Sequence, residues 1–263
     1  MLPKDYLAYR MTGVHATDLS DASGTLLLDV EHQTWSEEML AICGIREWML
    51  PRLHKSYDCI GRLRPDIAEE LELPFEVKVA AGAGDNAASA IATGTVGEGR
   101  CNLSLGTSGT LFISSDHFCR DASNALHSFC DASGRYHLMG CMLSAASCNK
   151  WWMEEILEES DYAAGQKRIE KTRLGENTVF YLPYLMGERS PLNDPYARAC
   201  FVGMTMDTRQ ADLTQAVLEG VAFACRDMLE VARRQGMIID RSKLVGGGSR
   251  SFLWQKILGN VRG

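Results

Sequence analysis

The sequence predicts an α/β protein with a mixed sheet, and two observations carry this prediction. Short segments with strand character alternate with segments of helical periodicity along the 263 residues. Glycine-centred hairpin signals interrupt this alternation, which favours antiparallel pairs beside parallel ones. The length allows one large domain or two smaller ones, and the predicted boundary is residues 96–100, where glycine and charge cluster.

Two short helices are predicted in the first half of the chain. Over residues 2–13 four apolar residues have nearly helical spacing, and Gly13 supplies the stop. Over residues 34–44 Thr34 and Glu37 have the spacing of a capping box, and a glycine again ends the segment. The chain begins inside the first helix and stops just after the start of another, so we expect a piece of a longer protein.

The rest of this half is expected to consist mainly of turns and loops. Asp, Ser and Gly mark turns before the short apolar run at residues 26–28, and Pro51, Pro65 and Pro74 punctuate a loop-rich connection. After Pro74 the pattern changes to a strand, a glycine-rich turn and a helix of small residues. The turn and the start of this helix have the sequence AGAGDNAASA, residues 81–90.

The second half predicts two hairpins and several helices. Residues 101–115 indicate two strands about a Gly-Thr-Ser-Gly turn, and a second hairpin is expected around Gly134. Helical spacing returns at residues 144–158 and 209–234, and a last helix follows a strand that ends at Val245. The stripe predicted for the long helix consists of small and apolar residues: Leu213, Val217, Gly220, Ala224, Met228 and Val231.

Composition narrows the class of protein. A formal net charge of -7 at pH 7 argues against a nucleic-acid partner, because phosphate binding needs a basic surface, but it leaves room for a small anionic ligand. No apolar run of about 18 residues and no signal-peptide core is visible, so we expect a cytoplasmic protein without a membrane partner. The nine cysteines form no CxxC pair and the six histidines no metal-binding motif, which predicts reduced, mostly buried thiols and no protein-bound metal.

Three glycine-rich turns are candidate ligand sites: residues 81–90, 103–110 and 244–251. Each follows a predicted strand, and glycine lets backbone N–H groups approach an anion while Thr and Ser hydroxyls add donors. None matches the Walker A pattern or GxGxxG, and each alone is more typical of a plain tight turn. Together they could converge on one nucleotide across a cleft, an arrangement that needs an acid near the acceptor hydroxyl.

Asp85 meets that need, and two interpretations compete for it. A carboxylate at the start of a helix is stabilised by the helix dipole, so Asp85 could be only an N-cap. Alternatively, Asp85 accepts the proton of a sugar hydroxyl as that hydroxyl attacks a phosphoryl group. In this second interpretation Asn86 holds a neighbouring hydroxyl, because its amide both donates and accepts.

Two further features are left open by the sequence. Trp151 and Trp152 could stack on an adenine, but a helix with the sequence WWMEEIL more commonly buries such rings in the core. Arg189 either reaches the cleft or pairs with a neighbouring acid.

These segments resemble one known family, the FGGY carbohydrate kinases, over essentially the whole chain. The motifs that carry the resemblance are LPKDYLAYRMTG, TDLSDASGTLLLD, AGAGDNAASA, LSLGTSGT, LSAASCNKWW, YLMGERSPLNDPYARACFVGM and LVGGGSRS. The stretch ACFVGMTMDTRQADLTQAVLE is similar to the family's second signature along its length. GDN together with SLGTSG is most similar to those members that phosphorylate xylulose.

The resemblance implies a fold and a set of site residues. The fold is the ribonuclease H-like, two-domain kinase fold of the actin, hexokinase and Hsp70 superfamily, here incomplete, with ATP and sugar in the cleft between the domains. Residues 1–97 correspond to the C-terminal part of the family's N-terminal, sugar-side domain, and residues 98–263 to most of its C-terminal, nucleotide-side domain. The site residues carried over are Asp85 as catalytic base, Asn86 as substrate contact, and Gly106, Thr107, Ser108, Gly247, Gly248 and Ser249 as nucleotide contacts.

The activity that the resemblance implies is ATP-dependent phosphorylation of D-xylulose to D-xylulose 5-phosphate, with Mg²⁺ bridging the ATP phosphates. The family's first phosphate loop, with its acid for the metal, has no counterpart in these residues, so the chain alone is expected to be inactive. Alternatives are an FGGY kinase of another sugar or polyol, such as gluconate, fuculose or ribulose, and a non-catalytic actin-like ATPase module. The oligomeric state is left open, with a homodimer among the allowed assemblies.

Overall fold

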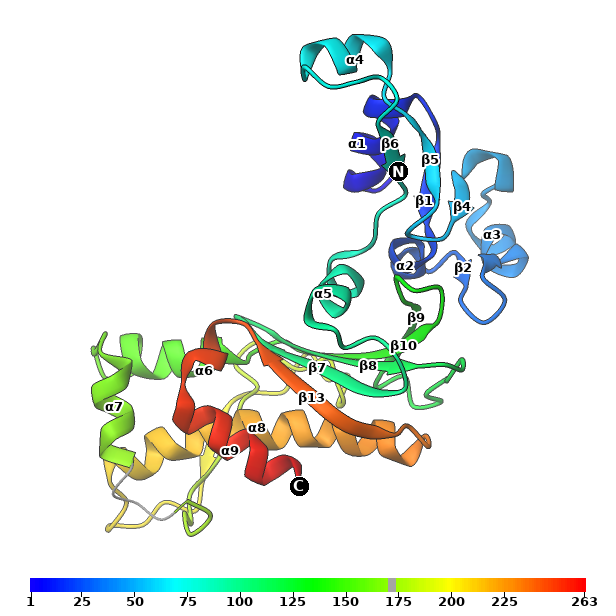
Figure 1. Cartoon of the computed structure of the whole chain (residues 1–263). Coiled ribbons are helices and arrows are strands. Elements are labelled where there is room, and N and C mark those ends of the chain that lie inside the picture. Colours follow the sequence, from blue (N-terminus) through cyan, green and yellow to red (C-terminus); the bar gives the residue numbers. More distant parts are fainter. Residues whose placement is uncertain (170–173) are drawn as a thin grey trace. The chain divides into compact units, whose positions relative to one another are not determined.

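The computed structural model describes residues 1–169 and 174–263 as a mixed α/β protein (Figure 1). The chain forms two compact units, which we call unit 1 and unit 2. Unit 1 takes Met1–Glu98, Ser114–Cys119 and Ser128–Leu138, and unit 2 takes Gly99–Ile113, Arg120–His127 and Met139–Gly263. The chain therefore first leaves unit 1 at Glu98 and returns to it twice.

Unit 1 is built from short elements. Its helical segments are α1 (Pro3–Thr12), α2 (Leu19–Ala22), η1 (Ser23–Thr25), α3 (Glu37–Cys43), η2 (Glu47–Met49), α4 (Pro65–Glu70) and α5 (Asp85–Thr93). Its early strands pair two by two: β1 (Ala16–Asp18) is parallel to β4 (Arg52–His54), β2 (Leu28–Asp29) is antiparallel to β3 (Thr34–Trp35), and β5 (Cys59–Arg62) is antiparallel to β6 (Lys78–Ala80).

The helix predicted over residues 2–13 is α1, and it ends at Gly13, whose φ of 75° is left-handed. Its apolar residues do not mark its buried face, because Tyr6 and Leu7 are exposed whereas Asp5 and Ala8 are buried. The buried carboxylate of Asp5 forms an ion pair with Lys4. Polar contacts as well as apolar ones therefore hold this helix in place.

Two details predicted for unit 1 are wrong. The N-cap of α3 is Ser36, whose Oγ accepts a hydrogen bond from Met39 N at 3.3 Å, and not Thr34, which is already paired in β3. Pro65 was expected to mark a loop but is the first residue of α4, where a missing N–H costs nothing because the first turn has no partner for it.

The apolar core of unit 1 consists of small clusters. One cluster comprises Ala8, Ala16, Ile60 and Ala81, and another comprises Leu19, Ala22, Leu28 and Cys130. The unit also buries polar side chains, among them Asp5, Asp18 and Ser20. Since most of these apolar residues are small, directional polar contacts have a larger share in defining the structure of this unit.

The largest sheet has the strand order β13-β7-β8-β10-β9. Its strands are β7 (Gly99–Leu105), β8 (Gly109–Ser115), β9 (His127–Cys130), β10 (Tyr136–Met142) and β13 (Ile239–Val245). β7 and β8 are antiparallel, as predicted for the Gly-Thr-Ser-Gly hairpin, whereas β13 is parallel to β7. Gly134, with a φ of 86°, lies in the turn between β9 and β10. The predicted mixed sheet is therefore confirmed.

Helices pack on the part of the largest sheet that belongs to unit 2 (Figure 1). The remaining elements are α6 (Ala146–Lys150), the π-helix η3 (Trp151–Ile156), α7 (Tyr162–Ile169), β11 (Phe180–Leu182) antiparallel to β12 (Cys200–Val202), α8 (Gln210–Arg234), η4 (Gly247–Arg250) and α9 (Phe252–Arg262). α8 and α9 lie on one face of β7 and β13 (Figure 1). Among the described residues, no helix has the length and apolar character needed to cross a membrane.

The long helix α8 confirms the predicted apolar stripe at its centre. Val217, Gly220, Ala224 and Met228 are buried, whereas both ends of the stripe are half-buried. Gly220 is needed for a close approach, because a Cβ on this residue would overlap the carbonyl oxygen of Tyr181 in β11. The absence of a side chain at this position lets β11 pack directly against the helix.

All nine cysteines are free thiols. Four are buried, namely Cys101, Cys130, Cys148 and Cys225, while Cys43, Cys59 and Cys200 are exposed and Cys119 and Cys141 lie between. The prediction of mostly buried thiols is therefore wrong. The reason is clearest in unit 1, where α3 and β5 each bury a single side chain and leave their cysteines facing solvent.

Candidate functional site

Asp85 is the first residue of α5, and Gly84 rather than Asp85 is the N-cap. The Asp85 Oδ1 accepts hydrogen bonds from the backbone N–H of Asn86 at 2.7 Å and from its side-chain Nδ2 at 3.2 Å. Asp85 is exposed, whereas Asn86 is half-buried. Gly84 thus takes the N-cap position that one interpretation gave to Asp85, and Asp85 presents an accessible carboxylate at the positive end of the helix.

Further acids lie near this helix start, and one lysine faces them. The Nζ of Lys4 lies 2.7 Å from Asp5 Oδ1, 2.8 Å from Asp18 Oδ1 and 3.8 Å from Asp21 Oδ2. Burial raises the pKa of Asp21, the charge of Lys4 opposes this, and the charges of Asp18, Asp5 and Asp85 add to it. The sequence pattern did not reveal this cluster, because its members come from separate segments with no shared spacing.

The tip of the β7–β8 hairpin presents Gly106, Thr107 and Ser108, and the last two are exposed. Its carbonyl groups accept hydrogen bonds from the start of α6. Gly106 O accepts from Ala146 N at 2.9 Å, and Thr107 O accepts from the Ser147 hydroxyl at 2.7 Å. Because these carbonyls turn toward α6, the side-chain hydroxyls of the tip are left accessible to an anionic ligand.

The turn after β13 packs tightly on the end of β7. Gly246 has a φ of 86°, and a Cβ there would lie 2.6 Å from the carbonyl oxygen of Leu105. Gly248 is buried against the same leucine. The Ser249 hydroxyl donates to Gly246 O at 2.7 Å, and Gln255 Nε2 donates to Ser249 O at 2.6 Å. Two glycines thus allow the close approach, and two hydrogen bonds hold the turn's shape.

The hairpin tip and the glycine turn lie at the same edge of the sheet. β7 and β13 are parallel, with Val245 opposite Ser104, so the segments that follow both strands leave from the same end. The structure therefore brings together Gly106, Thr107, Ser108, Gly247, Gly248 and Ser249. Asp85 and Asn86 form a separate part of the candidate site on unit 1.

Glu188 binds the backbone of the segment that precedes α6 and was not found by sequence reasoning. Its Oε1 accepts hydrogen bonds from Leu143 N at 2.9 Å and Arg189 N at 2.7 Å, and the residue is 2% exposed. Burial raises the pKa of this carboxyl group. For Arg189 the structure gives a side-chain hydrogen bond from Nε to His127 Nε2 at 3.2 Å.

The two tryptophans differ in their environment. Trp152 is buried, donates from Nε1 to Thr214 Oγ1 at 3.0 Å and lies 5.3 Å from the ring of Phe201. Trp151 is half-buried. The core interpretation is therefore confirmed for Trp152.

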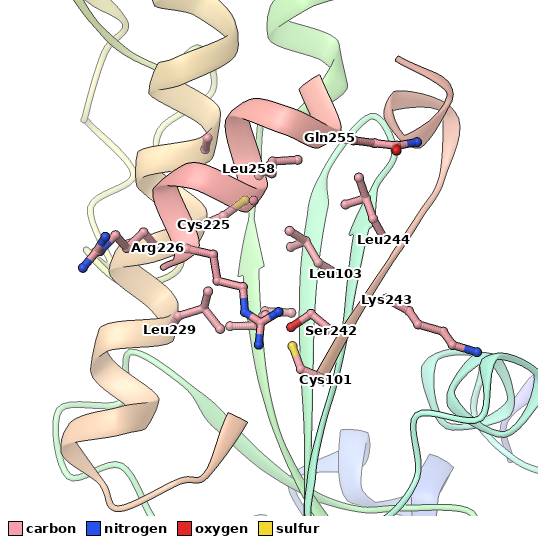
Figure 2. A pocket seen from close by; sticks show the side chains of 14 residues that line it. Cys101, Leu103, Cys225, Arg226, Leu229, Ser242, Lys243, Leu244, Gln255 and Leu258 are labelled. Atoms are coloured by element: carbon pink, nitrogen blue, oxygen red, sulfur yellow. The ribbon is translucent and has the colours of Figure 1, made fainter. Parts of the chain in front are cut away.

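A cavity of about 340 Å³ lies between the strands β7 and β13 and the helices α8 and α9 (Figure 2). Leu103, Leu229 and Leu258 give it an apolar lining, and Arg226 and Lys243 also contribute to it. None of the eight predicted site residues lines this cavity. The predicted site residues thus lie in two turns and at a helix start, and not around this cavity.

The predicted site residues fit a magnesium ion only when the phosphates of a nucleotide bind the same ion. Within residues 1–169 and 174–263, no three His, Cys, Asp or Glu side chains are grouped so as to hold a metal ion. Mg²⁺ commonly takes one or two carboxylates and completes its shell with water and phosphate oxygens. On unit 1, the exposed Asp85 carboxylate is an oxygen ligand of the kind that this mode requires.

The solved structures that this chain resembles are sugar kinases with the actin- and hexokinase-like fold, and this fold defines the class of the protein. The chain belongs to the FGGY family of carbohydrate kinases. The model of the family's N-terminal domain matches residues 1–92, and that of its C-terminal domain matches residues 101–263. The limits at residues 97 and 98 that the sequence suggested for these two domains stay a prediction.

The similar proteins are sugar kinases about twice as long. A xylulose kinase of Klebsiella pneumoniae is 42% identical over 264 residues, which cover 100% of this chain and 54% of that protein. The crystal structure of a "xyloylose kinase" from Brucella ovis has a TM-score of 0.94 at 42% identity. The match covers 100% of this chain and 54% of that chain. The gluconate kinase of Lactobacillus acidophilus has a TM-score of 0.91 at 26% identity, with 98% of this chain and 53% of that chain covered. The chain thus spans about half the length of the relatives it matches.

Proposed function

We propose that the protein carrying this chain transfers the terminal phosphoryl group of ATP to D-xylulose and forms D-xylulose 5-phosphate. The observation that carries the proposal is an exposed carboxylate, Asp85, held on Asn86 at the start of α5 in a chain that is 42% identical to a xylulose kinase. A cytoplasmic location, and the absence of nucleic-acid and membrane partners, stay expectations from the sequence.

In this proposal Asp85 accepts the proton of the sugar's terminal hydroxyl group. The hydroxyl oxygen forms the new bond to the γ-phosphorus, and the bond from that phosphorus to the bridging oxygen of ADP breaks. Because the transition state of phosphoryl transfer is loose, catalysis depends mainly on positioning, and a carboxylate suffices as the base. Asn86 would hold a neighbouring sugar hydroxyl, since its amide both donates and accepts.

The nucleotide is assigned to unit 2. The hydroxyls and backbone N–H groups of Gly106, Thr107 and Ser108 would bind phosphate oxygens, and Gly247, Gly248 and Ser249 would form the turn next to the adenosine. Mg²⁺, when bound with ATP, neutralises charge that develops on the phosphates. The accessible hydroxyls of Thr107 and Ser108 and the close packing of the glycine turn support this assignment.

A second candidate is the same chemistry on another sugar or polyol. The TM-score of 0.91 with a gluconate kinase favours it, because one backbone of this family accommodates more than one substrate. Gluconate, fuculose and ribulose are the substrates to compare with D-xylulose. A non-catalytic actin-like ATPase would use the nucleotide turns but would have no need for Asp85 and Asn86.

A substrate panel separates these candidates. The full-length protein is incubated with ATP, Mg²⁺ and each sugar, and ADP release is followed in a coupled assay. We expect the highest kcat/KM for D-xylulose. A higher value for gluconate, fuculose or ribulose would reassign the substrate, and ATP hydrolysis that no sugar accelerates would favour the non-catalytic module.

A further inference from the structure

The turn at residues 81–84, which leads into the candidate base, is held at both ends by side chains from the beginning of the chain. At one end, the carbonyl oxygen of Ala81 accepts a hydrogen bond from Lys4 Nζ at 3.3 Å. At the other end, the backbone N–H of Gly84 donates to Ser20 Oγ at 3.0 Å. Both contacts lie within unit 1 and link the turn to segments far away in the sequence.

These contacts converge on one carboxylate, that of Asp18, whose side chain is fully buried. Its Oδ1 lies 2.8 Å from Lys4 Nζ. Its Oδ2 accepts the Ser20 hydroxyl at 2.5 Å, Ser20 N at 2.9 Å and the Ser56 hydroxyl at 2.7 Å. Ser56 also holds the turn, because its carbonyl oxygen accepts the N–H of Gly82 at 3.0 Å.

The hydrogen-bond roles in this network leave little freedom. A serine hydroxyl has one proton, and Ser20 donates it to Asp18, so a lone pair of Ser20 must face the N–H of Gly84. Burial alone would lower the pKa of Lys4, but its hydrogen bonds to Asp18 and Asp5 raise it, which keeps the ammonium charged. Hydrogen bonds to ionised groups are the stronger and shorter kind, so the bonds to Asp18 fix the positions of Lys4, Ser20 and Ser56, whose contacts then hold the turn.

The turn itself needs this support. Gly82 has a φ of 81°, in the left-handed region that favours glycine, and Gly84 is the N-cap of α5 without a side chain of its own to close the helix start. A glycine-rich segment has many alternative backbone conformations. The contacts from Lys4, Ser20 and Ser56 select one of them.

We propose that Lys4, Asp18 and Ser20 are positioning residues for Asp85, which fix the turn at residues 81–84 and with it the point where α5 begins. The inference rests on the proposed role of Asp85 in phosphoryl transfer. A displacement of a reacting group by about 1 Å can cost on the order of a hundredfold in rate, so a network that fixes this turn bears directly on turnover.

Ser23 provides a matched control for Ser20. Its hydroxyl is buried, donates to Leu19 O at 2.7 Å and accepts the backbone N–H of Cys130 at 3.0 Å. Like Ser20, it binds the backbone of a segment distant in the sequence, but it does not touch the turn before Asp85. Ser20→Ala leaves the part-buried N–H of Gly84 without its acceptor, and Ser23→Ala does the same to the buried N–H of Cys130, so both variants should perturb folding.

Hydrogen exchange of the full-length protein tests the turn without reference to activity. We expect the Gly84 amide to exchange at least about tenfold faster in Ser20→Ala, and to change less than about twofold in Ser23→Ala, in which the Cys130 amide responds instead. Lys4→Met removes the partly exposed end of the network. Like Ser20→Ala, it should accelerate hydrogen exchange of the Gly84 amide. Equal protection of Gly84 in Ser20→Ala and Ser23→Ala would overturn the proposal.

Kinetics of the same variants test the consequence for catalysis. In Ser20→Ala we expect kcat to fall at least about tenfold, while the KM for ATP changes less than about threefold, and in Ser23→Ala both should stay within about twofold of the parent. Counting ATP-binding sites corrects for any unfolded enzyme. Equal kcat in the two variants would refute the positioning role. Should the parent phosphorylate no sugar at all, the proposed function fails, while the exchange experiment still decides whether the network holds the turn.

Discussion

Gly248 lies directly against Leu105, the last residue of β7, so that a Cβ built on Gly248 would be 2.9 Å from the Leu105 Cβ and 3.0 Å from the ring of Trp254. The adjacent Gly247 has nothing within 4 Å of its Cβ position. Neither glycine has a positive φ, so the difference between them is one of space and not of backbone conformation. Gly248 lets the turn pack on the sheet, whereas Gly247 borders open space.

Alanine at these two positions should therefore have different effects. Gly248→Ala is expected to destabilise the protein by roughly 1–3 kcal/mol, because the added methyl group must push Leu105 or Trp254 aside. Gly247→Ala should change the free energy of unfolding by less than about 0.5 kcal/mol. Chemical denaturation of the two variants beside the parent measures both values. Equal losses would contradict the packing that distinguishes the two glycines.

Asp85→Asn in the full-length protein should abolish sugar phosphorylation and leave ATP affinity within a few fold. The substitution removes the proton acceptor but keeps the shape of the side chain, and general-base catalysis is commonly worth about a hundredfold or more. Steady-state kinetics and calorimetric titration with ATP give the two quantities. A loss of turnover below about tenfold would rule out the base assignment, and a parallel loss of ATP binding would point to a structural role.

Thr107→Val should weaken nucleotide binding and leave sugar binding nearly unchanged. Valine keeps the volume of the exposed Thr107 side chain and removes its hydroxyl, so a lost phosphate contact should raise the dissociation constant for ATP by about 1 kcal/mol or more. Since the carbonyl of Thr107 is held by α6, the hairpin tip should keep its shape. Equal ATP affinity of variant and parent in calorimetry would exclude a phosphate contact from this hydroxyl.

The 263-residue chain by itself should show no measurable kinase turnover. The chain spans about half the length of its relatives, and phosphoryl transfer depends on holding metal, phosphates and acceptor in one geometry. Weak adenine nucleotide binding, with a dissociation constant around millimolar, corresponds to about 4 kcal/mol and is expected to persist. A coupled assay with ATP, Mg²⁺ and D-xylulose compares the chain with the full-length enzyme. Turnover within about a hundredfold of that enzyme would show that these residues suffice.

His137 should make the stability of the protein depend on pH. Its ring is buried and stacks on Phe129 at a centroid distance of 5.3 Å, and burial lowers its pKa from 6.5 to about 3. Between these values the unfolded chain binds a proton that the folded protein does not. This contribution to stability is therefore complete above pH 6.5 and is lost as the pH falls, with a slope of up to about 1.4 kcal/mol per pH unit.

The substitution that tests this is His137→Gln, because glutamine keeps hydrogen-bonding capacity and does not titrate in this range. Urea denaturation at about pH 7 and about pH 5 should show a smaller decrease in the free energy of unfolding for His137→Gln than for the parent. His117→Gln, at an exposed position, serves as the control and should keep the parent's decrease. If the free energy of unfolding of His137→Gln decreases as much as that of the parent, other groups cause the pH dependence.

Local patterns in the sequence were sufficient for elements whose signals lie within the element itself. The 3.6-residue spacing between residues 209 and 234 predicted α8, and the Gly-Thr-Ser-Gly turn predicted the β7–β8 hairpin. Gly13 and Gly44 end their helices with left-handed φ, as expected for glycine after a helix. In each case a short stretch of chain contains both the element and the residue that limits it.

Choices between neighbouring residues were less predictable. Thr34 and Ser36 are both common N-caps, and only the pairing of Thr34 in β3 leaves Ser36 to cap α3. Asp85 is a favoured capping residue as well, yet Gly84 holds that position. A propensity scale ranks residue types. It does not take account of hydrogen bonds between one candidate residue and a second segment of the chain.

The sequence by itself determined the mixed α/β class, the long elements, the membership in the FGGY family and the residue types of the candidate site. Only the tertiary structure decided how that site is supported. It placed Gly106–Ser108 and Gly247–Ser249 at one sheet edge, and it brought Ser20 to the N–H of Gly84 across 64 residues of chain. The physical reason is that periodicity and turn signals act over a few neighbouring residues. A hydrogen bond between distant segments depends instead on where packing places both of them. No spacing pattern along a single sequence predicts such a bond.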